Sequence, residues 1–417
     1  AGSVSTSGTI DASIVSVGGD WYRCSVVFNG SNTNVYVYPN YIGAASAGFI
    51  YIQDAQLEQG LAASPYIPTT TTTAQAGVLE NTPRLNYTTG VANPYLLLEP
   101  SRTNIITNSE YLGGSDWIKS GNGTGSVPVI TSNAAISPEG VQNATRVDLD
   151  LNGGTSSGDW SWVYQNFTST GNDETFSMYI KAVDASNVGK VIAFGAVSFT
   201  AQSLTADWVR IESTSSAAVG GYGNGFRLRG TEGTSNTASF YVFGIQHEQN
   251  ASYPTSYIPT YSVSATRAQD VCNKTDASGE IGQTEGTMFV DFTFNGNPTS
   301  VDYSIMILGA IGSNYITIGG YNTSLYARVF NTTMQGTINA FSMVAGTRYK
   351  VALAYANNDV VMYVNGVNEG SDTSASIPAV SQIGFTRPSY GASTDILNSQ
   401  VYKERLTNAE LATLTTI

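Results

Sequence analysis

The sequence predicts an all-β fold built from tandem β-sandwiches. Three observations support this prediction: a motif that occurs twice, a composition rich in turn-forming residues, and short alternating segments separated by turns. Charged residues make up only 12% of the 417 residues, against about a quarter in an average globular protein, and the chain has 43 glycines and 25 tyrosines. This composition is typical of β-sandwiches with many turns and differs from that of helical enzymes.

The duplicated motif indicates two related modules. Each copy contains a Gln-X-Glu tripeptide, ends in Tyr-Ile-Pro-Thr, and follows a Trp-X-Arg tripeptide. Two sets of matching motifs in the same order indicate a duplicated unit and not a chance tripeptide. The matching residues are Trp21, Arg23, Gln56, Glu58, Tyr66 and Pro68 in the first copy, and Trp208, Arg210, Gln246, Glu248, Tyr257 and Pro259 in the second.

We expect this motif to close each module. The segment Ser239–Ile245 is rich in aromatic and β-branched residues and is predicted to be a buried strand. On a strand, the Gln and Glu of Gln-X-Glu project to the same face, where they can hydrogen-bond neighbouring backbone at the strand end. The proline of Tyr-Ile-Pro-Thr removes a backbone donor and fixes φ, so the module is expected to end there.

The repeat also predicts the domain organisation. When the copies are aligned on their shared motifs, roughly 100 residues that precede Trp208 have no counterpart before Trp21. Residues 1–69 are therefore expected to form the C-terminal half of a jelly roll, either truncated or beginning late. We expect a linker at 70–104, a complete jelly roll at 105–260, a second linker at 261–285 and a third sandwich at 286–417. Leu96–Leu98 is too apolar for a free tether and is expected to pack against a neighbouring module.

Local patterns predict the elements of the complete jelly roll. Thr175–Lys181 alternates between apolar and polar residues, and Val191–Phe194 and Trp208–Ile211 are also predicted to be strands. Gly220–Gly225 is expected to be a loop, because so many glycines weaken a strand. Short strands separated by turn signals favour a sandwich or jelly roll.

The last part of the chain shows a similar pattern with one helix added. Thr287–Phe294 alternates strictly, Arg348–Tyr355 is predicted to be a strand, and Asp359–Gly366 is predicted to be a strand followed by an Asn-Gly turn. Near the C-terminus, Thr407 with Glu410 three residues later forms a capping box, which predicts a short helix. These patterns predict a third β-sandwich with a small terminal helix.

Charge and hydropathy exclude two classes of partner. The net charge of −13 and the pI near 4.4 argue against nucleic acid, because such proteins concentrate Lys and Arg. No apolar run reaches the roughly 20 residues of a membrane helix, so membrane insertion is not expected. Ala1–Ser3 lacks the basic start of a secretory signal. Cys24 and Cys272 are expected to be free thiols, and the redox compartment stays open.

Several motifs in combination resemble a known family. Leu97–Asn104, the paired Gln-X-Glu and Tyr-Ile-Pro-Thr motifs and Thr266–Ala268 resemble tailed-bacteriophage structural proteins, the fibres and appendages built from carbohydrate-binding-module-like jelly rolls. Tyr363–Gly366 and Tyr402–Leu411 resemble a concanavalin A-like lectin/glucanase (laminin-G-like) domain. The chain departs from the pattern where Thr73 stands in place of Arg. The motif residues in the linkers are Glu99, Arg102, Asn104 and Arg267.

This resemblance implies a protein on the exterior of the phage virion. It implies a head or tail fibre that is a homotrimer, contacts other virion proteins and binds host-surface glycans through its sandwiches. The apolar segment Leu96–Leu98, which could pack between subunits, agrees with a trimer. The alternative is a structural or decorative virion protein whose sandwiches serve assembly without a ligand. A distant alternative is a secreted polysaccharide-degrading enzyme.

The residues needed for catalysis or metal binding are scarce. His247, the one histidine, stands where the first copy has Leu57, so we interpret it as a packed strand residue and not as a triad base. One histidine and two distant cysteines cannot supply a four-ligand site. We expect no cofactor, although a structural calcium held by loop oxygens stays open.

Acidic residues give no clear sign of glycoside hydrolysis either. The pairs Asp54 with Glu58 and Asp159 with Glu174 are equally well explained by surface or strand-end hydrogen bonds. The Glu-X-Asp-X-X-Glu string of laminarinase-like domains does not occur between residues 286 and 417. The sequence therefore predicts that the chain is not an enzyme.

Sugar binding requires less: exposed aromatic rings for stacking and a few polar groups for hydroxyls. Trp160 and Trp162 alternate onto one strand face, but burial in the core is the preferred interpretation because tryptophan is mostly buried. Tyr222 in the glycine-rich segment is more strongly expected to be exposed. The glycan-binding candidates are Trp160, Trp162, Tyr222, Asn224, Arg387 and Tyr390.

Overall fold

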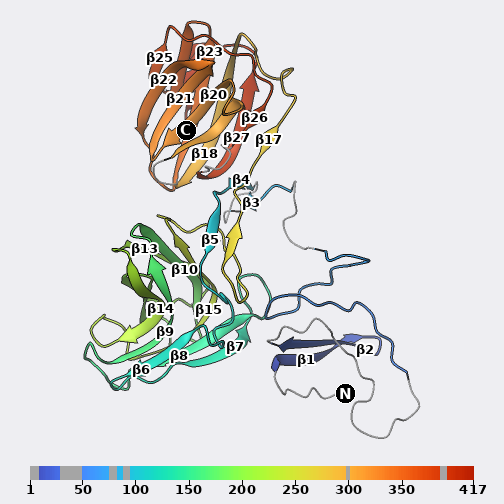
Figure 1. The fold of residues 1–417 in the computed structure, drawn as a ribbon, viewed down its shortest axis with the longest axis vertical. Coiled ribbons are helices and arrows are strands. Elements are labelled where there is room, and N and C mark those ends of the chain that lie inside the picture. The colour runs from blue at the N-terminus through green and yellow to red at the C-terminus, as the bar shows by residue number, and fades with distance from the viewer. Residues whose placement is uncertain (1–8, 29–48, 75–81, 88–93, 297–300, 386–391) are drawn as a thin grey trace.

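The computed structural model describes residues 9–28, 49–74, 82–87, 94–296, 301–385 and 392–417 (Figure 1). Its strands pair antiparallel and form sheets that pack as β-sandwiches, which confirms the predicted fold class. The first strands, β1 (Thr9–Gly18) and β2 (Trp21–Phe28), form a hairpin. No helix in the described part of the chain is long and apolar enough to cross a membrane.

The middle module is a sandwich of a seven-stranded and a five-stranded sheet. The seven-stranded sheet has the order β13-β10-β15-β5-β16, with β8 beside β15 and β7 beside β8. The five-stranded sheet has the order β12-β11-β14-β9-β6. The strands of the first sheet are β5 (Arg102–Asn104), β7 (Val129–Ala135), β8 (Ala144–Asp150), β10 (Asp173–Ala182), β13 (Val209–Ser216), β15 (Thr237–Gln249) and β16 (Ala265–Arg267). Those of the second are β6 (Ile118–Asn122), β9 (Trp160–Ser169), β11 (Val191–Gly195), β12 (Phe199–Ser203) and β14 (Gly220–Arg229).

Alternation along the strands builds the core between these two sheets. Phe176 and Phe240 come from the seven-stranded sheet, Phe194 and Phe226 come from the five-stranded sheet, and all four are buried. The rings of Phe226 and Phe240 meet edge to face with centroids 5.4 Å apart. Each buried aromatic side chain of this kind contributes on the order of 2 kcal/mol through loss of apolar surface from water.

The C-terminal part is a second sandwich, of six and seven strands. Its sheets have the orders β17-β26-β19-β20-β21-β22 and β25-β24-β23-β18-β27-β4-β3. The six-stranded sheet consists of β17 (Asn273–Lys274), β19 (Asp302–Gly309), β20 (Tyr315–Tyr321), β21 (Ser324–Asn331), β22 (Thr333–Ser342) and β26 (Ile383–Gly384). The other consists of β3 (Leu85–Asn86), β4 (Tyr95–Leu98), β18 (Glu285–Gly296), β23 (Thr347–Ala356), β24 (Asp359–Val364), β25 (Val367–Asp372) and β27 (Ser393–Tyr402).

Helix α1 (Asn408–Thr415) follows the last strand. Thr407 accepts a hydrogen bond from the backbone of Glu410, and the Glu410 side chain accepts one from the backbone of Thr407, which confirms the capping box. Leu411 is fully buried and packs with Phe289. The helix thereby packs on the outer side of the seven-stranded sheet of the C-terminal sandwich.

Both predicted linkers need correction. The segment 261–285 contains β16, which pairs with β5, and β17, which pairs with β26. The segment 70–104 contains strands, because β4 pairs with β27 in the C-terminal sandwich and β5 pairs with β15 and β16 in the middle module. Leu98 is buried in the core of the C-terminal sandwich, and Leu96 packs against that core. The expected packing of Leu96–Leu98 on a neighbouring module is thus confirmed, and its form is an added strand.

Candidate functional site

An aromatic cluster lies on the outer side of the five-stranded sheet of the middle module. Along β9, Ser161, Val163 and Gln165 are buried toward the core, so Trp160 and Trp162 project to the opposite side, where they are half-buried. The two tryptophans share a face, as predicted. The preferred interpretation of that face as the core side is wrong, because the smaller and aliphatic residues of β9 occupy the core instead.

The cluster contains three rings and one cation. Trp162 stacks on Tyr164 with centroids 3.9 Å apart, and Phe199 of β12 meets Trp162 edge-on at 5.9 Å. The guanidinium carbon of Arg227 lies 3.8 Å from the Phe199 centroid and 5.1 Å from that of Trp162. Such cation–π contacts each contribute about 0.5–2 kcal/mol and hold the rings in place.

Glu232 completes the cluster with a carboxylate. It accepts a hydrogen bond from Arg227 Nε at 2.8 Å and pairs with the Arg227 Nη2 group. Arg229 Nη1 lies 3.4 Å from the same carboxylate. The outer face thus presents aromatic rings beside a fixed arrangement of two cations and one anion.

The predicted loop at Gly220–Gly225 is instead the first half of strand β14, which pairs with β9 along its whole length. The glycines are explained by the neighbouring rings. A Cβ atom on Gly223 would lie 2.9 Å from Cζ2 of Trp162 and 3.0 Å from Cδ2 of Tyr164. Glycine is therefore needed here for a close approach of rings to backbone, and the weak intrinsic strand propensity is overridden by pairing.

Asn224 belongs to the interior and not to the outer face. It is buried, and its Nδ2 donates to Nδ1 of His247 at 2.8 Å. The interpretation of Asn224 as a sugar-binding residue is wrong, because on a strand it points opposite to Gly223 and Arg227. Tyr222 shares the inner side, is half-buried near the sheet edge and donates to the carbonyl of Ala218 at 3.1 Å.

His247 is a buried strand residue, as predicted. With Nδ1 accepting from Asn224, Nε2 carries the proton and donates to Glu174 Oε2 at 3.0 Å. Burial lowers the pKa of His247, so the ring is neutral in the fold. Burial acts to raise the pKa of Glu174, but hydrogen bonds from His247 and Thr170 outweigh it and the pKa lies below its usual value.

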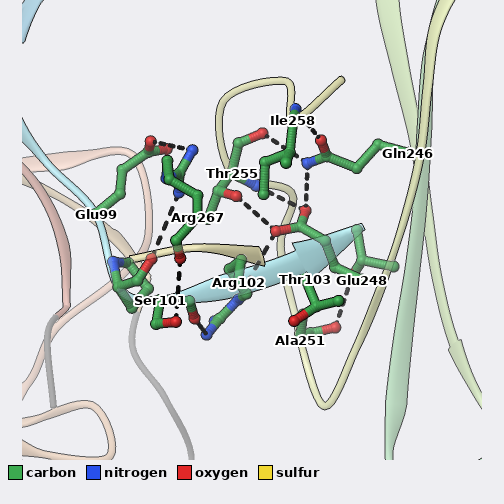
Figure 2. A network of polar contacts seen from close by, with 12 residues as sticks. Glu99, Ser101, Arg102, Thr103, Gln246, Glu248, Ala251, Thr255, Ile258 and Arg267 are labelled. Carbon is green, nitrogen blue, oxygen red and sulfur yellow. Dashed lines mark hydrogen bonds and ion pairs between the residues drawn. The ribbon is translucent and has the colours of Figure 1, made fainter. Parts of the chain in front are cut away.

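The Gln-X-Glu motif of the second copy forms the polar network in Figure 2. Glu248 accepts from Gln246 Nε2 at 2.8 Å, from Thr255 N at 2.9 Å and from Thr255 Oγ1 at 2.5 Å. Ile258 N donates to Gln246 Oε1 at 2.7 Å, and Arg210 Nη2 donates to Thr255 O at 2.6 Å. The prediction that this pair hydrogen-bonds backbone at the strand end is confirmed.

The other motif residues tie the two sandwiches together. Glu99 is buried and contacts Arg84 at 2.5 Å. It also contacts Arg267 at 3.0 Å, as Figure 2 shows. Burial acts to raise the pKa of Glu99, but the charges of Arg267 and Arg84 hold it below its usual value. Asp270 joins the network through Arg84 at 2.7 Å. These contacts make the segment between the sandwiches a structural junction.

Of the other described residues singled out in the sequence, only Trp160 lies near the outer face. Trp160 lies beside the cluster and donates from Nε1 to Ser120 Oγ at 3.2 Å. Arg387 and Tyr390 lie outside the described residues. Cys24 and Cys272 are free. Within the described ranges, no group of three His, Cys, Asp or Glu side chains is placed to hold a metal ion.

Sequence reasoning missed four members of the outer cluster. Tyr164 continues the alternation of Trp160 and Trp162, and this signal could have found it. Arg227 alternates in the same way in Phe226-Arg227-Leu228-Arg229, next to the glycines. Nothing in the sequence places Phe199 or Glu232 beside them, because both contacts depend on the sheet order.

Comparisons with known proteins give weak structural likenesses. No protein-family model and no curated protein matches the chain. Domain 4 of the arabinanase AbnA from Geobacillus stearothermophilus, in complex with arabinotriose, is 14% identical with a TM-score of 0.29, over 37% of this chain and 77% of that domain. A botulinum neurotoxin type C structure, whose cell entry depends on two ganglioside molecules, is 13% identical with a TM-score of 0.30, over 36% and 40%. Trypanosoma rangeli sialidase is 11% identical with a TM-score of 0.29, over 70% and 62%.

These comparisons correct one prediction. The chain spans less than two thirds of the neurotoxin and sialidase structures, and scores of this size assign no ligand or reaction to it. The prediction that the chain is not an enzyme is nevertheless contradicted, because a sialidase and an arabinanase domain are among the matched structures. Glycoside hydrolases need two carboxylates across a cleft, and many place them there without a laminarinase-type string, so the lack of that string does not exclude hydrolysis.

Proposed function

We propose that the chain is an appendage protein on the exterior of a phage virion, a head or tail fibre, whose middle module binds host-surface glycans. The observation that carries glycan binding is the outer cluster of Trp162, Tyr164 and Phe199 beside the Arg227–Glu232 pair. Half-buried rings on a solvent-facing sheet are an unusual use of aromatic side chains, since such rings mostly complete a core.

The chemistry of this cluster suits a saccharide. The C–H faces of a pyranose pack on aromatic rings, while its hydroxyls need both donors and acceptors in fixed positions. Arg227 supplies donors and Glu232 supplies acceptors, and their mutual pairing orients both. The stack of Trp162 on Tyr164 fixes the rings, so little side-chain entropy is lost when a sugar binds.

The place on a virion is supported by the motif run Leu97–Asn104 and by the resemblance it carries. The same resemblance supports a homotrimer that contacts other virion proteins. Light scattering on the purified chain tests the oligomer: a mass of three chains of 44.0 kDa is expected, and a monomer overturns the trimer. The C-terminal sandwich is proposed to be concanavalin A-like.

A glycan array tests the binding function. The purified chain is expected to bind a subset of bacterial surface glycans, and Trp162→Ala and Arg227→Ala are each expected to weaken binding at least about tenfold. Tyr321→Ala is the matched control, because it removes an exposed aromatic ring from the other sandwich. Binding that is unchanged in Trp162→Ala overturns the proposed face.

The same preparation separates the alternatives. A flat array together with tight incorporation into particles favours a structural or decorative virion protein. Turnover of sialosides or arabinans by the purified chain favours a glycoside hydrolase.

A further inference from the structure

The five-stranded sheet of the middle module differs in charge from the rest of the chain. The whole sequence has 31 acidic and 18 basic residues. The strands β6, β9, β11, β12 and β14 are described in full, and they contain no aspartate or glutamate; their charged residues are Lys119, Arg227 and Arg229. The strands of the seven-stranded sheet that packs against them carry Asp148, Asp150, Asp173, Glu174, Glu212 and Glu248. The two sheets of one module therefore differ in charge.

The strand register puts both arginines of β14 on the outer face. Arg227 lies directly opposite Trp162 of β9, and Arg229 lies directly opposite Trp160. Residues paired in this way share a face, with Cβ atoms about 5 Å apart. The two guanidinium groups therefore belong to the same surface as the aromatic cluster.

The other charged groups near this sheet are used elsewhere. Lys119 of β6 pairs with Val163, which is buried in the core, and its Nζ donates to the carbonyl of Gly114 at 2.7 Å. In the loop before β9, the Asp159 carboxylate accepts from the backbone N of Thr124 at 3.0 Å and from that of Ser156 at 2.8 Å. The ion pairs of the outer face itself consist of two arginines and Glu232. One cation is therefore in excess there.

The contacts of the two arginines show which of them is the surplus cation. Arg227 donates to the Glu232 carboxylate from both Nε and Nη2, lies 3.8 Å from the centroid of Phe199, and has a side chain only 12% exposed. The side chain of Arg229 is 33% exposed. Its Nε donates to Ser157 O at 2.8 Å, its Nη1 lies 3.4 Å from Glu232, and its Nη2 has no partner among the residues that the structure describes. Arg229 is thus the cation that an anion from outside can reach.

We propose that the outer face binds a saccharide whose pyranose ring carries a carboxylate. Arg229 pairs with that carboxylate while the ring packs against the aromatic cluster. This inference rests on the proposed function and names the class of glycan that the face takes. In such a sugar the carboxylate carbon is bonded directly to the ring, so the cation that holds it must lie beside an aromatic side chain. Arg229 meets this condition because it lies opposite Trp160.

The form of the surplus cation favours a carboxylate over other groups. A guanidinium is planar and offers paired N–H donors that match the two oxygens of a carboxylate. The outer face already contains one such pair, because Arg227 holds the Glu232 carboxylate through two nitrogens. A neutral sugar makes no use of a charge in excess, whereas a carboxylated sugar compensates it.

The net charge of the chain does not oppose this binding at close range. The chain carries −13 and repels an acidic glycan at a distance. At physiological salt, however, charges more than about 8 Å apart are largely screened from each other. Recognition then depends on the charges next to the sugar, and on the outer face these have one cation in excess.

A glycan array of matched pairs tests the proposal on the full chain. Each pair consists of a carboxylated oligosaccharide and its carboxyl-reduced form, in which the carboxylate has become a primary alcohol and the ring is unchanged. One arm contains hexuronates and the other contains 2-keto sugar acids, so the arms distinguish the two sources of a ring carboxylate. In at least one arm the carboxylated form is expected to bind at least about tenfold more tightly. Equal binding within every pair, or an equal preference for sulfated sugars, overturns the carboxylate.

Variants of the chain locate the carboxylate at Arg229. Arg229→Gln is expected to weaken binding of the carboxylated form at least about tenfold and to leave binding of the reduced form unchanged. Arg229→Lys keeps the charge without the planar fork and is expected to retain part of the preference, so it decides the test where Arg229→Gln does not fold. Arg146→Gln is the matched control, because it removes an arginine that is 41% exposed from the other sheet of the same module. A preference that persists in full in Arg229→Gln overturns the assignment.

The same array separates this inference from the proposed function. Equal binding of both members of each pair, lost in Trp162→Ala, keeps the proposed glycan face and overturns the carboxylate. The absence of binding to every probe overturns both. A polyglutamate peptide is the last probe: displacement of the bound sugar by this peptide at equal concentration shows a site for acidic peptides and overturns the saccharide.

Discussion

Replacing Glu248 tests whether the buried copy of the motif stabilises the middle module. The Glu248 carboxylate is fully buried and accepts three hydrogen bonds, from Gln246 Nε2 and from N and Oγ1 of Thr255. In Glu248→Ala these three donors lose their acceptor, and Arg102 loses the nearest anion at 3.9 Å.

The expected loss of stability follows from these contacts. A buried donor left without an acceptor costs about 1–3 kcal/mol, and water that enters the space vacated by the carboxylate recovers part of this. For three donors, we expect Glu248→Ala to lower the free energy of unfolding of the middle module by about 3–5 kcal/mol. Glu248→Gln keeps one carbonyl acceptor and the side-chain volume, so its loss is expected to be about half as large.

Tryptophan fluorescence is the suitable assay. Four of the five tryptophans, Trp117, Trp160, Trp162 and Trp208, lie in the middle module, and the C-terminal sandwich has none. Urea unfolding followed by this signal therefore reports the middle module at a fixed protein concentration.

The matched control is Glu58→Ala in the first copy of the motif. Glu58 is half-buried and accepts from Gln56 Nε2 and from N and Oγ of Ser64, so this variant removes the corresponding hydrogen bonds. It is expected to leave the tryptophan transition of the middle module within about 0.5 kcal/mol of the parent. A loss below about 1 kcal/mol in Glu248→Ala, or equal shifts in the two variants, would refute the reasoning that burial makes these hydrogen bonds important.

Three further predictions concern pH and the outer face. Burial lowers the pKa of His247, so the fold favours the neutral ring; stability of the middle module is expected to fall as the pH drops below about 6.5, and His247→Leu to flatten that dependence in urea unfolding. Burial and the charge of Glu139 raise the pKa of Glu110 to about 7, so the folded state keeps a proton that the unfolded state releases above about pH 4.5. The free energy of unfolding is therefore expected to fall as the pH rises from about 4.5 to 7. Glu110→Gln is expected to be more stable than the parent at pH 8, by on the order of 2 kcal/mol, but not at pH 4. Gly223→Ala places a Cβ 2.9 Å from Trp162 and is expected to cost about 1–3 kcal/mol and to weaken glycan binding, whereas Gly221→Ala, with open space around its Cβ, is expected to change neither.

The sequence predicted features that depend on local pattern and missed those that depend on distant pairing. The hydrogen bonds of Gln246 and Glu248 were predictable because the motif acts within a few residues of itself. The pairing of β4 with β27 joins Leu97 to Asp395, and no local pattern indicates such a partner. Asn224 was misplaced for the same reason, because its environment is set by His247 on the facing sheet.

The aromatic face shows where period-two reasoning ends. Alternation placed Trp160 and Trp162 on one side of a strand, but both sides of a strand in a sandwich can carry apolar residues. Which side of β9 faces the core depends on the side chains of the other sheet. Here Phe176 and Phe240 of that sheet share the core with Val163. Glycines in β14 were then interpreted as a loop, although they make room for the rings.

A comparison of the two copies separates the hydrogen bonds that the motif forms within itself from those that Asn104 of β5 adds in the second copy. The hydrogen bonds among Gln56, Glu58, Ser64 and Ile67 form within 12 consecutive residues, in a half-exposed setting, so they need no neighbouring sheet. Within the Gln-X-Glu tripeptide, the two copies differ only at the central residue, Leu57 in the first copy and His247 in the second. Leucine stands where the side chain is 59% exposed, and histidine stands where Glu174 and Asn224 surround it. The residue between the Gln and the Glu of each copy therefore matches its surroundings: leucine where the position is exposed, and histidine where buried polar groups accept and donate hydrogen bonds.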